Sequence, residues 1–522
     1  MHTSKDLVFT LFNSDQNPLR QFPKTTQVQY LDVYLSELNA AAVIEEPNYF
    51  DRDYLDEFSA FYSLSSRGYP NICRRLHFFS SDLVDYELLK SAAAENDDAV
   101  KILKDSYLGF TIIRPIPSAP LGRTVLKWFP DNVPEMPRIT SPSRSYECHL
   151  AGVTLEVFGL AWQQQDTGVG ACATVGLWVA LHSSAFDDHH AVPTTAQITR
   201  AAHDGASLGA RMFPSSGLTM YQIMEAIKAQ ALAPIWCAGD RQHTDVLGQT
   251  VTGFSKERFA STCASFIRSG YPVLIWGQHL DDDIVQKHVI CAVGFRESPP
   301  PDLESGNVCL QDSETLFLYI HDDNLGPSVR FRIIDNGVDE KGNPIPVSIK
   351  TDPPNSNLPE SPTANYPEIR PEALCIAVHE CLRVSPDTLH AIGKELSLQL
   401  CNAINVILEE NKLEKISISS STRFIKLSDY ISSELGRVLE DKHDVLSKVR
   451  LALLEKVPPM SLHIGVVRFA LSNSTPIMDL LYDTTDTDRN CPVFAHVVYD
   501  KTVAVNIMSQ SVGYGVLVEA FI

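Results

Sequence analysis

The sequence predicts a multidomain protein of mixed α/β class, and three observations support this prediction. Its 522 residues, 44% of them hydrophobic, can bury more than one core, since a domain typically takes about 100 to 200 residues. Segments with apolar residues at helical spacing alternate with short strand-like runs. Two proline-rich stretches, 115–142 and 344–371, divide the chain. We expect an N-terminal mixed α/β region at 1–143, a middle domain at 144–340, a proline-rich linker or loop at 341–371, and a C-terminal α/β domain at 372–522.

The composition argues against a nucleic-acid partner and against a membrane-spanning protein. The chain has 43 Lys and Arg residues against 64 Asp and Glu residues, and a formal net charge of -21 repels a phosphate backbone, so no nucleic-acid partner is expected. No stretch approaches the roughly 18 apolar residues of a membrane span, and the first residues lack the apolar core of a secretory signal. The eleven cysteines include no CxxC pair and are typical of reduced thiols. We therefore expect a cytoplasmic protein without disulfides and without membrane contact.

Both flanking regions predict helices and strands. The first region is rich in Tyr and Phe. Strand-like runs lie at 107–115, 123–129, 373–384, 462–471 and 494–508. Ser385 is the expected N-cap of a long helix over 385–410, because apolar residues recur at helical spacing after it.

In the middle domain a cysteine opens a helix. A strand is expected at 147–162, followed by a turn through Gly168 and Gly170. The run 171–184 then carries apolar residues at helical steps. Cys172 therefore lies in the first turn, where unpaired backbone N–H groups and the helix dipole stabilise a thiolate.

A second helix and further strands follow. Thr219 and Gln222 have the spacing of a capping box at the start of that helix. Strand-like runs lie at 271–278, 287–295 and 316–327. His288 opens the second of these runs, at the mouth of a buried strand. Asp322 and Asp323 lie near the end of the third run, just before a Gly-Pro turn.

This order of parts resembles the papain-like cysteine peptidases, over about a third of the chain. The nearest resemblance is to the branch that cleaves double-glycine leaders from bacteriocin precursors. There a glutamine precedes the nucleophilic cysteine at a helix start, a histidine opens a later strand, and Asp or Asn ends the next strand. The resemblance implies an α+β fold in which the cysteine-bearing helix packs on an antiparallel sheet, flanked here by two further mixed α/β regions. It implies neither a metal nor a cofactor.

The resemblance also assigns roles to three residues. It implies that Cys172 is the nucleophile, His288 the general base and acid, and Asp322 the residue that orients the imidazole. The same residue types are needed on physical grounds, since a thiolate requires a base within hydrogen-bond reach and the base requires an orienting partner.

A glutamine would supply the oxyanion donor. The position about six residues before the cysteine, where the family has glutamine, is Asp166 in this sequence. If the residues 167–170 loop out, Gln165 takes the role, with Gln164 as the second choice.

Each of these residues also has an ordinary structural interpretation. Cys172 by itself is compatible with a small apolar residue packed at a helix end. His182 and His321 are rival bases, but His182 lies about three helical turns from Cys172, too far along the axis to contact it. His321 neighbours Asp322, and adjacent strand residues point to opposite faces, so only one of them faces the cleft. Asp323 is the alternative to Asp322.

Three polar stretches contain residue types that bind metals. Residues 187–190 (DDHH) are better explained as a solvated loop, since no second cluster at useful spacing supports a metal site. The three successive carboxylates at 281–283 are typical of an exposed turn. The segment from Asp486 begins like a calcium loop, but it has Cys491 where that loop needs Gly and Val497 where it needs Glu. No metal site is expected.

The sequence therefore predicts a thiol hydrolase that cleaves peptide or protein amide bonds through an acyl-enzyme. A transglutaminase or deamidase is an alternative, because it would use the same triad on glutamine side chains. In a third hypothesis the middle domain is an inactive scaffold, and the flanking regions bind a partner protein.

Overall fold

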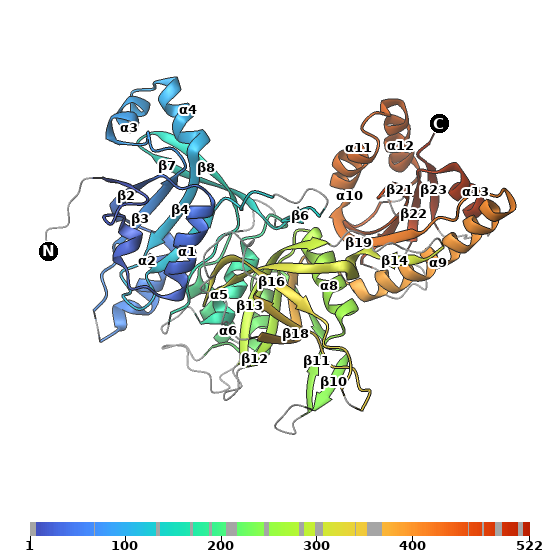
Figure 1. Cartoon of the computed structure of the whole chain (residues 1–522), viewed down its shortest axis with the longest axis horizontal. Coiled ribbons are helices and arrows are strands. Elements are labelled where there is room, and N and C mark those ends of the chain that lie inside the picture. The colour runs from blue at the N-terminus through green and yellow to red at the C-terminus, as the bar shows by residue number, and fades with distance from the viewer. Residues whose placement is uncertain are drawn as a thin grey trace.

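The structure is a computed structural model with three lobes that follow one another along the chain (Figure 1). It describes residues 7–66, 68–131, 136–166, 171–186, 191–204, 217–244, 250–280, 287–297, 306–339, 341–351, 368–457, 459–471, 474–485, 493–509 and 515–521. Helices and mostly antiparallel strands occur in all three lobes, which confirms the mixed α/β class. Within these ranges, no helix is both long and apolar enough to cross a membrane.

A five-stranded antiparallel sheet forms the N-terminal lobe, in the order β1-β2-β3-β4-β5. Its strands are β1 (Val8–Leu11), β2 (Ala42–Tyr49), β3 (Cys73–Phe79), β4 (Tyr107–Ile113) and β5 (Leu121–Leu126). Its helices are α1 (Thr26–Glu37), α2 (Arg52–Ala60), α3 (Tyr86–Ala93) and α4 (Asp97–Ser106), with short 3-10 helices at Pro18–Gln21 and Tyr62–Leu64. The helices start where Thr25, Asp51, Asp85 and Asn96 each accept a backbone N–H with the side chain. Strands β4 and β5 confirm the runs expected there.

The segment expected as one strand at 147–162 is a hairpin instead. Strands β7 (Arg144–Leu150) and β8 (Val153–Gly159) pair antiparallel around a two-residue turn. Ala151 and Gly152 have φ values of 49° and 84°, as in a type I′ turn, whose twist matches that of the flanking strands. Alanine seldom adopts a positive φ, so residue type alone does not predict this turn. The hairpin packs against β4 and β5.

In the middle lobe an antiparallel sheet closes on itself. Strands β12, β13, β15, β16, β17 and β18 pair in this order, and β18 pairs back to β12. Strand β9 extends the sheet beyond β18, and β6 pairs with β13. The bounds are β6 (Arg138–Ile139), β9 (Ala233–Ala238), β12 (Val273–Leu280), β13 (Lys287–Glu297), β15 (Thr315–Asp322), β16 (Gly326–Ile334), β17 (Ser348–Thr351) and β18 (Glu368–Val378), with a separate hairpin of β10 (Arg241–Thr244) and β11 (Thr250–Gly253). Strands β12, β13 and β15 confirm the three runs expected after the second helix.

Four helices accompany this sheet: α5 (Cys172–Leu181), α6 (Thr195–Asp204), α7 (Met220–Lys228) and α8 (Lys256–Arg268). Helix α5 begins at Cys172 as expected, and the capping box between Thr219 and Gln222 is formed at the start of α7. Helices α6 and α8 were not expected. The sequence of α8 includes several weak helix formers, but residues 259–267 are all buried, so tertiary packing overrides the low propensity.

A six-stranded sheet forms the C-terminal lobe, in the order β14-β19-β20-β21-β22-β23. Its strands are β14 (Val308–Leu310), β19 (Ile418–Lys426), β20 (His463–Leu471), β21 (Pro476–Asp483), β22 (Val493–Val498) and β23 (Val516–Glu519). Its helices are α9 (Pro386–Glu410), α10 (Leu427–Asp429), α11 (Leu435–Val438), α12 (His443–Lys456) and α13 (Lys501–Ser509), with a π-helical turn at Tyr430–Glu434. Ser385 caps α9 by accepting the N–H of Asp387, as expected.

Two expectations about this lobe are wrong. The run at 494–508 is not one strand, because α13 follows β22, and Asp500 caps that helix by accepting the N–H groups of Thr502 and Val503. The strand expected at 373–384 as part of the last domain is β18, which belongs to the closed sheet of the middle lobe.

The proline-rich stretches contain strands. Strand β17 and the start of β18 lie within 341–371, and residues 352–367 between them lie outside the described part of the chain. Strands β5 and β6 lie within 115–142, and they belong to different sheets. The chain therefore passes from the N-terminal sheet to the closed sheet between β5 and β6.

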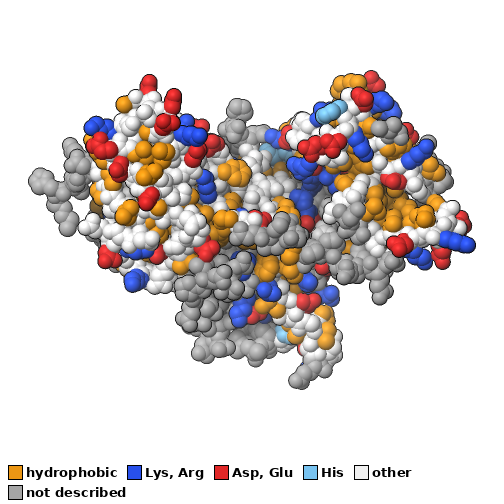
Figure 2. Space-filling view, turned by 45° about the horizontal axis from the view of Figure 1, so that its top comes forward, with side chains coloured by type: hydrophobic (Ala, Val, Ile, Leu, Met, Phe, Trp, Pro, Cys, Tyr) orange, Lys and Arg blue, Asp and Glu red, His pale blue; other side chains and the backbone are white. Residues whose placement is uncertain are grey.

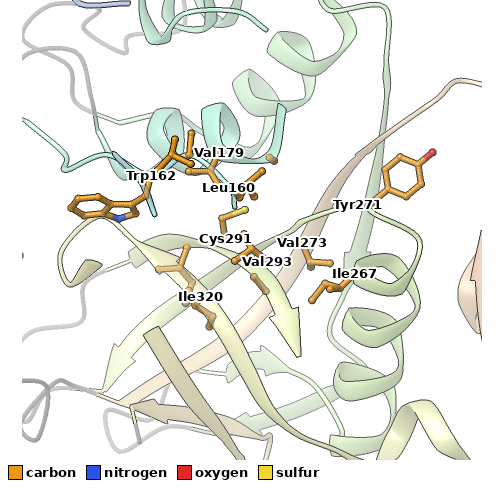
Figure 3. Close-up of a cluster of buried hydrophobic side chains, with 14 of the residues drawn as sticks. Leu160, Trp162, Val179, Ile267, Tyr271, Val273, Cys291, Val293 and Ile320 are labelled. Atoms are coloured by element: carbon orange, nitrogen blue, oxygen red, sulfur yellow. The ribbon is translucent and has the colours of Figure 1, made fainter. Parts of the chain in front are cut away.

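A buried apolar cluster joins α5 to the closed sheet (Figure 3). Val179 of α5, Cys291 of β13 and Ile320 of β15 are each at most 1% exposed. Trp162, from the segment that precedes α5, is also fully buried in this cluster. The position of α5 against β13 is thus set by close packing of apolar side chains.

Truncating this cluster should destabilise the protein. Leu177→Ala, in the fully buried part of α5, should lower the free energy of unfolding by about 2 to 5 kcal/mol, because it removes apolar contacts and leaves a cavity. The matched variant Leu454→Ala, at a 77% exposed position of α12, should change it by about 0.5 kcal/mol or less. Thermal and denaturant unfolding measure both. Equal losses from the two variants would contradict the described packing of α5.

Candidate active site

Cys172 is the first residue of α5. Ala171 is the N-cap with extended backbone (ψ 156°), and its side chain makes no capping hydrogen bond. Residues 173–181 are all buried, whereas Cys172 is half-buried. Gly176 lets the helix lie close to the sheet, because a Cβ there would lie 3.2 Å from a side-chain carbon of Leu274 in β12. The thiol therefore lies at the accessible end of a buried helix, among the unpaired N–H groups of its first turn.

His288 and Asp322 lie on neighbouring strands of the closed sheet. Strands β13 and β15 are antiparallel, with Cys291 opposite His321, and continuing this register puts position 288 opposite position 324. The start of β13 and the end of β15 therefore meet at the same edge of the sheet. Side chains 34 residues apart in sequence become neighbours there.

The three side chains lie next to one another. The Cys172 side chain interacts with the imidazole of His288 and helps to raise its pKa, and Nε2 of His288 lies 3.3 Å from Oδ1 of Asp322. The backbone N–H of Asn324 donates to the same Asp322 oxygen at 2.8 Å. The indole Nε1 of Trp162 donates to the backbone carbonyl of Asp322 at 2.9 Å. Asp322 is therefore held by its side chain and by its backbone, and its carboxylate in turn orients the ring of His288.

The charges around His288 favour its protonated form. Burial alone would lower the pKa of His288, but the carboxylates of Asp322 and Asp323 and the interaction with Cys172 outweigh burial. Together they raise the pKa well above the ordinary value of 6.5. An imidazolium beside a thiol is the arrangement that stabilises a thiolate.

A second carboxylate shares the site. Oδ1 of Asp323 lies 3.5 Å from Nε2 of His288. Burial raises the pKa of Asp323 to about 7, a shift that the charge of His288 opposes and the charge of Asp322 reinforces. One ligand atom from each of these three residues lies within 4.8 Å of the others, so together they could also hold a divalent cation.

The two candidate glutamines have different surroundings. The side-chain Oε1 of Gln164 accepts the backbone N–H of Leu121 in β5 at 3.3 Å, so this amide is bound to the N-terminal lobe. The side-chain Nε2 of Gln165 donates to the Oδ1 of Asn324. Asn324 also places its Nδ2 3.4 Å from Nε2 of His288. Gln165 thus lies beside the Cys-His-Asp group, and the Gln164 side chain does not.

The segment before α5 is anchored by a buried arginine. Arg114 contacts the carboxylates of Asp166 at 3.2 Å and Glu57 at 3.6 Å, and it donates to the carbonyl of Gln164 at 2.9 Å. Burial raises the pKa of Glu57 to about 7, although the nearby guanidinium opposes this shift. Asp166 occupies the position where the family resemblance implies glutamine, and its carboxylate is part of this anchor.

The two rival histidines are occupied elsewhere. His182 is the C-cap of α5, and its Nδ1 lies 3.2 Å from the hydroxyl of Tyr146. His321 accepts the N–H of Ser328 at Nδ1, so its Nε2–H donates to the carbonyl of Leu160 at 3.1 Å. Burial lowers the pKa of His321 to about 4, and a hydrogen bond to that carbonyl only partly opposes this shift. Both rings are bound to groups outside the Cys172 site.

The N-terminal lobe contacts the turn that carries the carboxylates. Gln27 of α1 donates to the backbone carbonyl of Asp323 at 3.4 Å. Tyr30 of the same helix packs on Gly326, where a Cβ would lie 2.1 Å from a ring carbon. A residue without a side chain is therefore required at position 326, and the turn is supported from a different lobe.

Some features of the site were not predicted from the sequence. These are the indole of Trp162, the amide of Asn324, and His279 of β12, whose ring centroid lies 5.0 Å from that of His288. The polar run at the end of β15 was the available signal for Asn324, whereas nothing local marks Trp162. The glycine turn at 167–170 and the stretches at 187–190, 281–283 and 486–492 lie outside the described residues.

Comparison with known proteins supplies no relative. No protein-family model matches the sequence, and no curated protein matches it significantly. Function is therefore inferred from the side chains and their contacts.

The thiols should differ in reactivity toward iodoacetamide at neutral pH. Cys172 should react well before Cys291 and Cys375, because both of these are buried and burial raises the pKa of Cys375 to about 12. His288→Ala should slow the alkylation of Cys172 by about tenfold or more, since it removes the neighbouring cation. Peptide mass spectrometry measures the rate at each site.

Cys381 provides an internal control for this experiment. It is also half-buried, and its sulfur lies 3.3 Å from Nδ1 of a different histidine, His463. Its alkylation rate should therefore be unchanged in His288→Ala. An unchanged rate at Cys172, or equal slowing at both sites, would contradict a specific pairing of Cys172 with His288.

Proposed function

We propose that this protein is a cysteine hydrolase of papain-like type that cleaves amide bonds in peptides or proteins. The observation that carries the proposal is the buried chain of contacts from Cys172 through His288 to Asp322. A nucleophile, a base and a group that orients the base are the parts that thiol catalysis needs.

The arrangement of elements supports the same proposal. The cysteine begins a buried helix, α5, that packs on β13. The histidine opens that strand, and the carboxylate ends the neighbouring antiparallel strand β15. This is the arrangement that the family resemblance implies. The N- and C-terminal lobes, which together are larger than the middle lobe, would then present the substrate or a partner protein to the site.

The first half of the reaction is an acyl transfer to sulfur. The thiolate of Cys172 attacks the amide carbonyl carbon, and the carbonyl π electrons move onto oxygen as an oxyanion. The C–N bond then breaks, and the departing nitrogen takes the proton from the imidazolium of His288. The products of this half are a free amine and a thioester on Cys172.

The second half returns the enzyme to its starting state. Neutral His288 takes a proton from water as the water oxygen attacks the thioester carbon, and the C–S bond breaks to regenerate the thiolate. A carboxylic acid leaves. Asp322 keeps the imidazole oriented and stabilises its charged form in both halves. The backbone N–H of Cys172 and the side-chain amide of Gln165 would stabilise the oxyanion.

The thiol route accounts for more of the site than a metal-activated water does. A cation bound by His288, Asp322 and Asp323 would take the Nε2 position that now faces the carboxylates. It would leave Cys172 without a role, although that residue interacts with the same ring. The thiol mechanism gives a role to Cys172 as well as to the histidine and the carboxylate.

Substitutions of Cys172 and Asp322 should change the rate of hydrolysis according to the role of each residue. Cys172→Ala should abolish hydrolysis with little change in melting temperature, since alanine suits the first turn of a helix. Asp322→Asn should be milder than Asp322→Ala, because an amide oxygen can still accept the imidazole N–H. Adding Asp322→Ala to Cys172→Ala should cause no further loss, because the residues act as a unit. The assay is hydrolysis of a peptide or protein substrate found by screening.

A metal chelator is the matched control for this series. Excess EDTA should leave hydrolysis unchanged, whereas alkylation of Cys172 should stop it. Full activity of Cys172→Ala combined with loss of activity in EDTA would refute the thiol mechanism and favour the cation site.

The two glutamines should differ in their effect on catalysis. Gln165→Ala should lower kcat by about 100- to 1000-fold with a small change in KM, as expected for loss of one oxyanion donor. Gln164→Ala is the matched control. It should lower the free energy of unfolding and change kcat little, because the Gln164 side chain binds the backbone N–H of Leu121. Steady-state kinetics separates the two outcomes. A larger kcat loss for Gln164→Ala would contradict the assignment of Gln165.

A further inference from the structure

A cavity of about 510 Å³ lies between the middle and C-terminal lobes. The middle lobe contributes the end of α8, the turn at 269–271 and the residues after α5. The C-terminal lobe contributes β19, β20 and the helical segment 429–437. Figure 2 shows Lys and Arg side chains gathered beside the hollow between these lobes. The volume is in the range of small-molecule sites.

The side chains that line this cavity are mainly cationic. They include Arg268, Arg423, Lys426, Arg437 and Arg468, together with His463. Two carboxylates, Asp429 and Glu434, also line it. Five cationic and two anionic side chains therefore line the cavity in a chain with a net charge of -21, and carboxylates behind the lining pair with Arg268 and Arg468. A lining with more cations than anions favours an anionic ligand.

Buried carboxylates hold two of the arginines from behind. Asp479 is fully buried and contacts Arg468 at 2.8 Å. Arg268 contacts two carboxylates, the fully buried Asp312 and the partly buried Glu297. None of these three carboxylates lines the cavity. These ion pairs fix the guanidinium groups in place, and an arginine has five N–H donors, so donors remain for a ligand.

Arg423 has N–H donors besides the one that bonds to Glu434. Within the described part of the chain, it donates only through Nη2, to Glu434. Its side chain is 14% exposed, so the other N–H groups are reached from the cavity. Arg437 also contacts Glu434, at 3.0 Å, and is 72% exposed. Glu434 thus aligns cations without neutralising all of them.

The two walls of the cavity are bonded to one another. The backbone N–H of Phe424 in β19 donates to the hydroxyl of Ser269 at 2.7 Å, and the N–H of Thr422 donates to Asp312 at 2.7 Å. The rings of His379 and His463 stack with centroids 4.5 Å apart. The cavity is therefore preformed, which reduces the ordering that a ligand would impose.

We infer that this cavity binds a small molecule that carries two or more linked phosphate groups. Guanidinium groups bind phosphate through paired N–H···O bonds, and a lysine adds a point charge. A single phosphate presents few oxygens to the five lining cations, whereas linked phosphates present more of them in the same 510 Å³ cavity. The site is independent of the proposed hydrolase chemistry, and its test needs no substrate.

The location suggests what such a ligand would do. Ser184 and Ala185 line the cavity and follow the C-terminal end of α5, the helix whose first residue is Cys172. A ligand there would contact both lobes at once. The more tightly it binds, the more it would stabilise the association of the two lobes.

The test is binding to the full chain measured by isothermal titration calorimetry and by thermal melting. The probes are pyrophosphate and ATP, with inorganic phosphate and adenosine for comparison. Pyrophosphate and ATP should bind and raise the melting temperature, and phosphate should bind more weakly. If ATP binds and pyrophosphate does not, the nucleoside dominates recognition and the phosphate-based inference is wrong. Absence of binding by both also overturns it.

Charge variants locate the site. Lys426→Ala and Arg437→Ala should each weaken pyrophosphate binding by about tenfold, as expected for loss of a charge-assisted contact. Both positions are partly or largely exposed, so the fold should survive. Lys90→Ala, at a 65% exposed position of α3, is the matched control and should leave the affinity unchanged. Equal affinity in all three variants would place the ligand elsewhere and overturn the inference.

Discussion

A buried imidazole between a thiol and two carboxylates is the interaction on which the site depends. Burial disfavours the charged form of His288, so a protonated ring persists there only because Asp322 and Asp323 lie within 3.5 Å of its Nε2. A change in the burial of His288, or the loss of either carboxylate, would therefore change the charge of the imidazole beside Cys172. The surrounding structure holds the thiol, the imidazole and the two carboxylates together.

Three parts of the fold hold the groups in place. The antiparallel register of β13 and β15 brings the start of one strand beside the end of the other. The apolar packing of α5 sets the height of Cys172 over that sheet edge. The N-terminal lobe supports the carboxylate turn through Gln27 and Tyr30, and it anchors the segment before α5 through Arg114. The site therefore requires more than the middle lobe.

Local patterns in the sequence predicted part of the fold and the elements that carry the site residues. The start of α5 at Cys172, the opening of β13 at His288 and the end of β15 at Asp322 each follow from short-range spacing. The hairpin turn at Ala151 was missed because its backbone conformation is rare for alanine, and α8 was missed because burial overrides its weak propensity. The role of Trp162 could not be foreseen, since its hydrogen bond reaches Asp322 in a distant part of the sequence. The cavity could not be foreseen either, because its lining comes from two lobes.

The central proposal pairs a thiolate at Cys172 with a protonated His288, and the ultraviolet absorbance of thiolates tests this pairing directly. The spectrum of the native protein at neutral pH is compared with those of Cys172→Ala and His288→Ala. Cys375→Ala is the control, because burial raises the pKa of Cys375 to about 12. The account predicts that the first two variants each lose the absorbance of one thiolate and that the control loses none. Identical spectra for the native protein and Cys172→Ala would contradict it.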